Sequence, residues 1–122
     1  MTETDADIEK RPTFAANRPN DVLKDIALSN LHLLDLPEVI EEYSNSGGST
    51  DFGNVACAVP GILIYLPYCV GGGHSKEWYD EGKTEAAAYC LLTSAKALAG
   101  VSFDLILKPE LVKRVKDAFR GA

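Results

Sequence analysis

Two short apolar runs near the middle of the chain constrain its fold most strongly. The runs are 55–59 and 62–66, and only Pro60 and Gly61 separate them. Both are apolar at consecutive positions, and the second is rich in β-branched and aromatic residues, which is typical of strands buried on both faces. We therefore predict an α/β fold in which short buried strands are packed by amphipathic helices.

Helical periodicity surrounds these predicted strands. With Asn20 or Asp21 as a cap, apolar residues recur every three or four positions over 20–34, and a short continuation follows at 37–43. The same spacing predicts one helix over 83–107, and Pro109 is suited to the first position of a last helix. In the helix over 83–107 we expect a stripe of residues to be buried against the sheet: Ala87, Ala88, Leu91, Ala95, Leu98 and Ala99.

Length and composition are those of one small globular domain. The chain has 122 residues, of which 46% are hydrophobic and 25% charged. Residues 1–19 contain acidic residues and prolines without apolar periodicity, so we predict a flexible N-terminal extension followed by a domain over 20–122. No continuous apolar run reaches the ~18 residues that a membrane span needs. We expect a cytoplasmic protein with no membrane contact.

The net charge of −6 argues against nucleic acid as a partner. Basic residues concentrate only over 108–120, where they alternate with apolar residues at helical spacing. This pattern favours a solvated helix face over an anion-binding patch. The three cysteines are Cys57, Cys69 and Cys90. They lie in apolar contexts without a Cys-x-x-Cys pair, which predicts buried reduced thiols and no cysteine zinc knuckle.

Two polar points flank the predicted strands, and we expect them to belong to one site. The first is a cluster at the strand entrance, made of Ser49, Thr50, Asp51 and Asn54. The second is His74, about 20 residues later in a glycine-flanked loop where a scaffold can hold a functional side chain. Both sites also have a purely structural interpretation, because the Asp51 side chain can hydrogen-bond to the backbone of its own turn and His74 can cap its loop. Glu77, just after the histidine, is suited either to orienting its ring or to starting a helix.

The motifs taken together resemble the C-terminal end of zinc-dependent amidohydrolases, the family of aminoacylase, carnosinase and carboxypeptidase G2. Within that family they are most similar to the β-alanyl-lysine (Xaa-Arg) dipeptidases. The resemblance covers about residues 20–120 in order and spacing. It rests on Gly48–Val55, Val59–Ile62, His74 with Glu77, Thr84–Ala87, Ala95–Ala99 and Lys108–Leu111.

The resemblance implies the C-terminal half of an α/β zinc-peptidase-like catalytic domain, with zinc as cofactor and a dipeptide or N-acyl amino acid as substrate. It implies that His74 is a metal ligand, and that Ser49, Thr50, Asp51 and Asn54 shape the pocket. No residue of the chain matches the family's catalytic base. We therefore expect the chain to be inactive alone and to need an N-terminal companion chain. The alternative is a non-catalytic binding or self-associating scaffold derived from the same domain.

Overall fold

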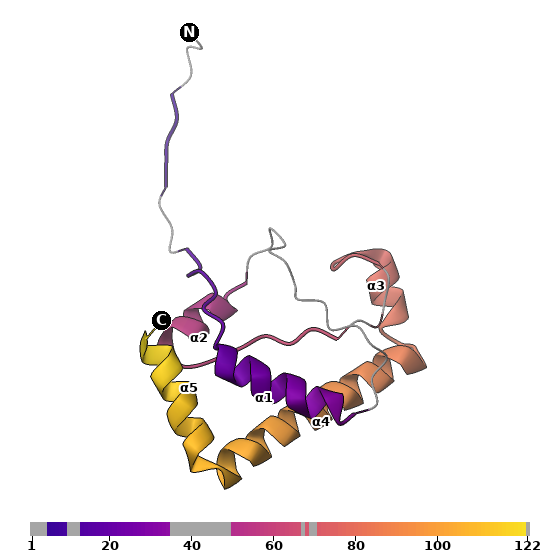
Figure 1. The fold of residues 1–122 in the computed structure, drawn as a ribbon. Helices are drawn as coiled ribbons and strands as arrows, with labels where there is room; N and C mark the ends of the chain where they lie inside the picture. The colour runs from indigo at the N-terminus through magenta and orange to yellow at the C-terminus, as the bar shows by residue number, and fades with distance from the viewer. Residues whose placement is uncertain (1–4, 10–12, 35–49, 67, 69–70, 122) are drawn as a thin grey trace.

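The structure is a computed structural model that describes residues 5–9, 13–34, 50–66, 68 and 71–121. In these ranges the chain forms α1 (Asp21–His32), α2 (Phe52–Ala58), α3 (Lys76–Glu81), α4 (Glu85–Leu107) and α5 (Pro109–Gly121). α1 packs against α4 and α5, and α4 also contacts α5. Figure 1 shows α5 turning back from the end of α4, with α2 near the C-terminus and α3 at the opposite end of the molecule.

Asn20 fixes the start of α1 and joins it to two other parts of the chain. Its side-chain oxygen accepts from the Leu23 amide at 3.1 Å, as the cap prediction requires. Its side-chain amide donates to the Val115 carbonyl at 3.0 Å, and its backbone amide donates to the Gly61 carbonyl at 3.1 Å. Asn20 itself is buried. One polar residue therefore holds α1, α5 and the segment after α2 together.

The hydrophobic core is small and lies between α1 and α5. Leu23, Ile26 and Val115 form it, and partly buried residues pack around them: Val22, Ile62, Val101, Leu105 and Leu111. The predicted apolar stripe of α1 is thus confirmed, because Leu23, Ile26, Ala27 and Leu31 are its buried residues. Among the described residues no large side chain is fully buried.

A polar contact fixes α1 against α4. Asn30 donates to the Asp104 carboxylate at 2.9 Å, and Lys108 donates to the same carboxylate at 2.6 Å. These two hydrogen bonds, the one from Lys108 first, hold the pKa of Asp104 below its usual value. Gly100 permits the approach, since a Cβ there would lie 2.1 Å from the Asn30 side-chain oxygen.

The predicted α/β fold is wrong for the described part of the chain, which contains helices and no strand. The run 55–59, predicted as a strand, lies mostly in α2. Its alanines favour a helix, and the Thr50 hydroxyl accepts from the Phe52 amide at 3.2 Å just before that helix begins. The run 62–66 lies in neither a helix nor a strand, since a strand exists only by pairing with another and the described ranges contain none.

The helix predicted over 83–107 is confirmed as α4, but the prediction of its buried face is wrong. The residues that α4 buries are Thr93 and Ala97, which face α1. The predicted stripe is largely exposed: Leu91 keeps 73% of its surface and Leu98 keeps 59%. We call the exposed apolar side of this helix the outer α4 face, formed by Ala88, Leu91, Leu92, Ala95, Leu98, Ala99, Phe103 and Ile106.

α4 is also long and apolar enough to cross a membrane, judged by length and composition alone. An 18-residue window within it has a mean hydropathy of 1.6 and at most two charged residues, and 11% of the window is buried. This corrects the expectation that no segment of the chain meets that requirement. The expectation failed because it was based on unbroken apolar runs. The mean hydropathy of α4 stays high although Thr93, Ser94 and Lys96 lie among its apolar residues.

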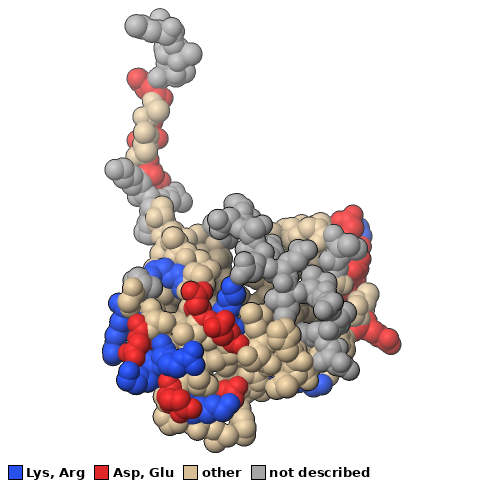
Figure 2. Space-filling view, viewed as in Figure 1, with Lys and Arg blue, Asp and Glu red and all other residues tan. Residues whose placement is uncertain are grey.

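The basic segment 108–120 forms the solvated face of α5, as the periodicity predicts. Val115 is the buried residue of this helix. Figure 2 shows basic side chains gathered over α5 with acidic ones between them. Lys113, for example, pairs with Asp117 at 2.7 Å. The prediction of buried thiols is wrong for Cys57, which is exposed on α2; Cys90 is half-buried, and Cys69 lies outside the described residues.

The segment 13–16 lies against α2, and Gly53→Ala is expected to release it. A Cβ on the buried Gly53 would lie 1.9 Å from the Ala15 carbonyl oxygen. The clash is with backbone, so the segment must move and lose the hydrogen bond from the Ala15 amide to Asn54 at 2.8 Å. We expect hydrogen exchange at the Ala15 amide to become about tenfold faster, although alanine favours the helix by about 1 kcal/mol.

Gly72→Ala is the matched control for this substitution. A Cβ at Gly72 would meet nothing within 4 Å, so exchange at the Ala15 amide should stay unchanged. Equal exchange rates in the Gly53→Ala variant and the wild-type chain would contradict the expected clash.

Candidate functional site

His74 occupies a strained turn between a glycine loop and α3. Its φ angle of 68° lies in the left-handed region, which residues other than glycine rarely adopt. The turn is closed by a hydrogen bond of 3.1 Å from the Ser75 amide to the Gly72 carbonyl. The Ser75 hydroxyl then accepts from the Trp78 amide at 3.1 Å and caps α3. A non-glycine residue held in this conformation suggests a functional position.

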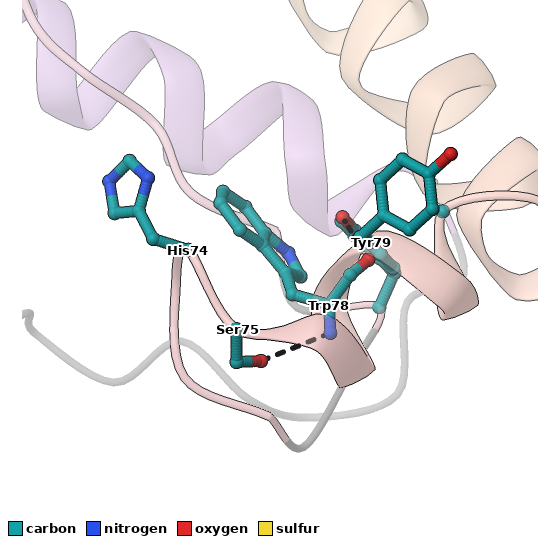
Figure 3. A pocket seen from close by; sticks show the side chains of 6 residues that line it. His74, Ser75, Trp78 and Tyr79 are labelled. Carbon is teal, nitrogen blue, oxygen red and sulfur yellow. Dashed lines mark hydrogen bonds between the residues drawn. The ribbon is translucent and has the colours of Figure 1, made fainter.

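A pair of stacked aromatic rings lies beside the histidine. The His74 and Trp78 rings meet edge to face, with centroids 6.0 Å apart and an interplanar angle of 78°. The Tyr68 ring stacks on the Trp78 indole, with ring centroids 6.1 Å apart and an interplanar angle of 20°. The Tyr68 hydroxyl donates to the Trp78 carbonyl at 3.3 Å. Figure 3 shows the imidazole and the indole on the same side of the loop, with Tyr79 following on α3.

These side chains line an open cavity of about 440 Å³. Its lining residues are Tyr68, His74, Ser75, Trp78, Tyr79 and Gly82. His74 is exposed and Trp78 keeps 38% of its surface, so a ligand can reach both rings from solvent. The cavity is therefore an open depression whose lining includes two stacked rings and one imidazole.

The segment 74–85, which contributes most of the cavity lining, is mainly acidic. Over 74–85 the chain carries four carboxylates, those of Glu77, Asp80, Glu81 and Glu85, against the ammonium groups of Lys76 and Lys83. Lys76 is paired with Asp80 four residues on along α3. The Lys83 ammonium lies 4.8 Å from the centre of the Tyr79 ring, a cation–π contact. Tyr79, one of the lining residues, thus contacts a cation of the chain, although Lys83 itself does not line the cavity.

The polar cluster predicted at the strand entrance begins α2 instead. Thr50 accepts from the Phe52 amide, and Asp51 stands at the cap position without a side-chain cap bond. Asn54 accepts from the Ala15 amide, so its side chain is engaged with the segment 13–16. Ser49 lies outside the described residues.

The structure does not bring the two predicted halves of the site together. None of Thr50, Asp51 and Asn54 lines the cavity beside His74. Figure 1 shows why: α2 and α3 lie at opposite ends of the described chain. Among the described residues, no three His, Cys, Asp or Glu side chains are placed to hold a metal ion together. The assignment of His74 as a metal ligand stays a prediction.

The aromatic lining was missed when the sequence was read for titratable and metal-binding residues. Trp78 is the chain's single tryptophan, and it lies four residues after His74. Three of the five tyrosines, Tyr65, Tyr68 and Tyr79, flank the same glycine loop. This local concentration of aromatic residues was the available signal.

Comparison with known proteins defines the class of this chain. It matches curated dipeptidases over 84% of its own length. These relatives are the Xaa-Arg dipeptidase of Homo sapiens, 34% identical over 107 residues, and the Xaa-Arg dipeptidase of Mus musculus, 35% identical over 105 residues. No family model matches the sequence. No solved structure matches it.

The resemblance to the C-terminal part of a dipeptidase, which the motifs predict, is therefore confirmed. The chain spans 24% of the length of the curated relatives. About three quarters of each relative thus has no counterpart in these 122 residues.

Proposed function

We propose that this chain is one part of a dipeptidase-type catalytic domain and hydrolyses dipeptides only together with a companion polypeptide that supplies the rest. The observation that supports the proposal most directly is the 34–35% identity to Xaa-Arg dipeptidases over 84% of the chain. The outer α4 face supports it as well, because an apolar stripe of this length is expected to be covered in a complete domain.

The donor set of the chain fits this division of labour. A hydrolytic zinc site uses three protein ligands, and the described residues offer His74 without two further donors beside it. The described residues therefore place no complete zinc site. In the proposal His74 contributes one nitrogen donor from a turn that α3 holds in place, and the companion contributes the other donors and the base.

Complementation tests the proposal. The chain is mixed with the part of the human Xaa-Arg dipeptidase that lies outside the matched region, and hydrolysis of a dipeptide ending in arginine is measured with added zinc. We expect activity from the mixture and none from either piece alone. In the mixture, His74→Ala should lower the rate by at least about 100-fold, because it removes a metal ligand.

His32→Ala is the matched control, because His32 is the other histidine of the chain and is exposed at the end of α1. It should leave the rate unchanged. Hydrolysis by the 122-residue chain alone would overturn the proposal. Failure of the mixture to hydrolyse, or an unchanged rate after His74→Ala, would also count against it.

A second candidate function is a self-associating scaffold derived from the same domain. The outer α4 face favours it: Leu91, Leu98 and Phe103 are 73%, 59% and 63% exposed and lie on one side of a single helix. In this candidate a second copy of the chain covers the face, with no need of zinc. Sedimentation distinguishes the two, because a scaffold forms a defined oligomer by itself and does not hydrolyse dipeptides after mixing.

A further inference from the structure

We propose that the aromatic cavity beside His74 binds the cationic side chain of a ligand, a guanidinium or an ammonium, by stacking it on Trp78. The further claim that this cation is the lysine or arginine side chain of a dipeptide substrate rests on the proposed function. The binding of the cation itself needs neither zinc nor a companion chain. Trp78 is in this proposal the residue that determines specificity.

The first argument for cation binding is the arrangement of the aromatic rings that line the cavity. Tyr68 is stacked on Trp78 with an interplanar angle of 20°, and its hydroxyl is bonded to the Trp78 carbonyl, so the two rings form a preorganised pair. Gly73 lies against the indole, since a Cβ there would be 3.7 Å from its ring. Trp78 still keeps 38% of its surface exposed, on which a flat guanidinium can stack, and tryptophan is the strongest aromatic partner for a cation.

The local charge carries the second step. The four carboxylates over 74–85 outnumber the two ammonium groups there, which favours a cationic ligand over an anionic one. The chain as a whole has a net charge of −6, in the same direction.

Lys83 carries the third step, because it already places its ammonium 4.8 Å from the Tyr79 ring centre. Tyr79, a ring of the cavity lining, thus makes with a cation of this chain the kind of contact that we propose between Trp78 and a ligand, although Lys83 itself does not line the cavity. Lys83 also competes with the ligand, by repulsion and by occupying Tyr79.

Tryptophan fluorescence tests the inference directly, because Trp78 is the single tryptophan of the chain. The full chain, without zinc, is titrated with arginine amide and with citrulline amide. These two probes share their shape and α-ammonium group and differ in the charge of the side-chain head. We expect saturable emission changes with arginine amide, and binding of citrulline amide about three- to fivefold weaker.

Substitutions distinguish the contribution of the Trp78 ring to binding from that of the rest of the surface. Binding of arginine amide is followed by NMR at the Ser75 and Gly82 amides. Trp78→Leu should weaken it about three- to fivefold, and Trp78→Phe, which keeps a ring, should weaken it less. Tyr89→Leu removes an exposed ring from α4, outside the cavity, and should change nothing. Lys83→Ala should strengthen binding about twofold, since it removes the competing cation.

Equal affinities for the two probes would overturn the inference, and so would unchanged binding in both Trp78 variants when circular dichroism shows that they are folded. Its failure is distinct from failure of the proposed function. Loss of discrimination between the probes leaves hydrolysis by the mixed pieces intact, and failed complementation leaves binding of arginine amide intact.

Discussion

Replacing Asn20 by alanine is expected to lower the free energy of unfolding by about 2–3 kcal/mol. The substitution removes the cap of α1, worth about 1 kcal/mol. It also removes the buried hydrogen bond from the Asn20 side-chain amide to the Val115 carbonyl, which costs a further 1–2 kcal/mol or so. Urea unfolding followed by circular dichroism measures the change, with the midpoint shifting while the slope stays constant.

Two controls separate these contributions. Asn20→Asp keeps an oxygen that accepts from the Leu23 amide but loses the donor to Val115. It should therefore destabilise the chain mainly through the lost hydrogen bond to the Val115 carbonyl. Asn54→Ala removes an exposed asparagine bond and should stay within about 0.5 kcal/mol of the wild-type value. A shift for Asn20→Ala no larger than that for Asn54→Ala would show that the junction at Asn20 does not hold the helices together.

If a second copy of the chain covers the outer α4 face, as the scaffold candidate proposes, lysine at both Leu91 and Leu98 is expected to abolish the self-association of the purified chain. The two residues lie seven positions apart on the outer α4 face, and both are largely exposed, so the fold of one copy should tolerate the change. Burying a leucine contributes roughly 1.5–3 kcal/mol, and in a dimer each substitution acts twice. We expect the dissociation constant to rise by more than about 100-fold, as sedimentation equilibrium can measure.

The double variant Leu33→Lys and Val59→Lys provides the matched control. It adds the same charge at positions that are 82% and 51% exposed but lie outside α4. Its association should equal that of the wild-type chain. A wild-type chain that stays monomeric at every concentration, or an equal loss of association in the control, would contradict self-association through the outer α4 face.

Where local chemistry decides the structure, the sequence predicted it well. Asn20 begins α1 because its side chain can satisfy an amide of the first turn, and Pro109 begins α5 because its fixed φ suits that position. The period of apolar residues then gave the extent of α4. These features depend on residues within one or two turns of each other, so they need no knowledge of the rest of the molecule.

The parts that failed depend on partners. The run 62–66 has the composition of a buried strand, yet the described chain places no other strand beside it. The stripe of Leu91 and Leu98 has the composition of a buried helix face, yet α1 packs on the opposite side. Composition reports how apolar a segment is, whereas pairing and coverage depend on which other segments are present.

The candidate site was predicted in part. His74 was singled out by its glycine loop, and the structure gives it a left-handed backbone and a cavity. The role of Trp78 followed only from the turn that brings its ring to the imidazole. The expected meeting with Asp51 does not occur, because α2 and α3 are held at opposite ends of the described chain.

The junction at Asn20 also bears on the order in which this chain folds. Asn20 and Val115 are separated by 95 residues, and the same pairing brings Leu23 and Ile26 to the core. Contacts so distant in sequence form late and slow the reaction. On the ribosome the core must wait for α5 to emerge, and until then the apolar side of α1 is open to chaperones.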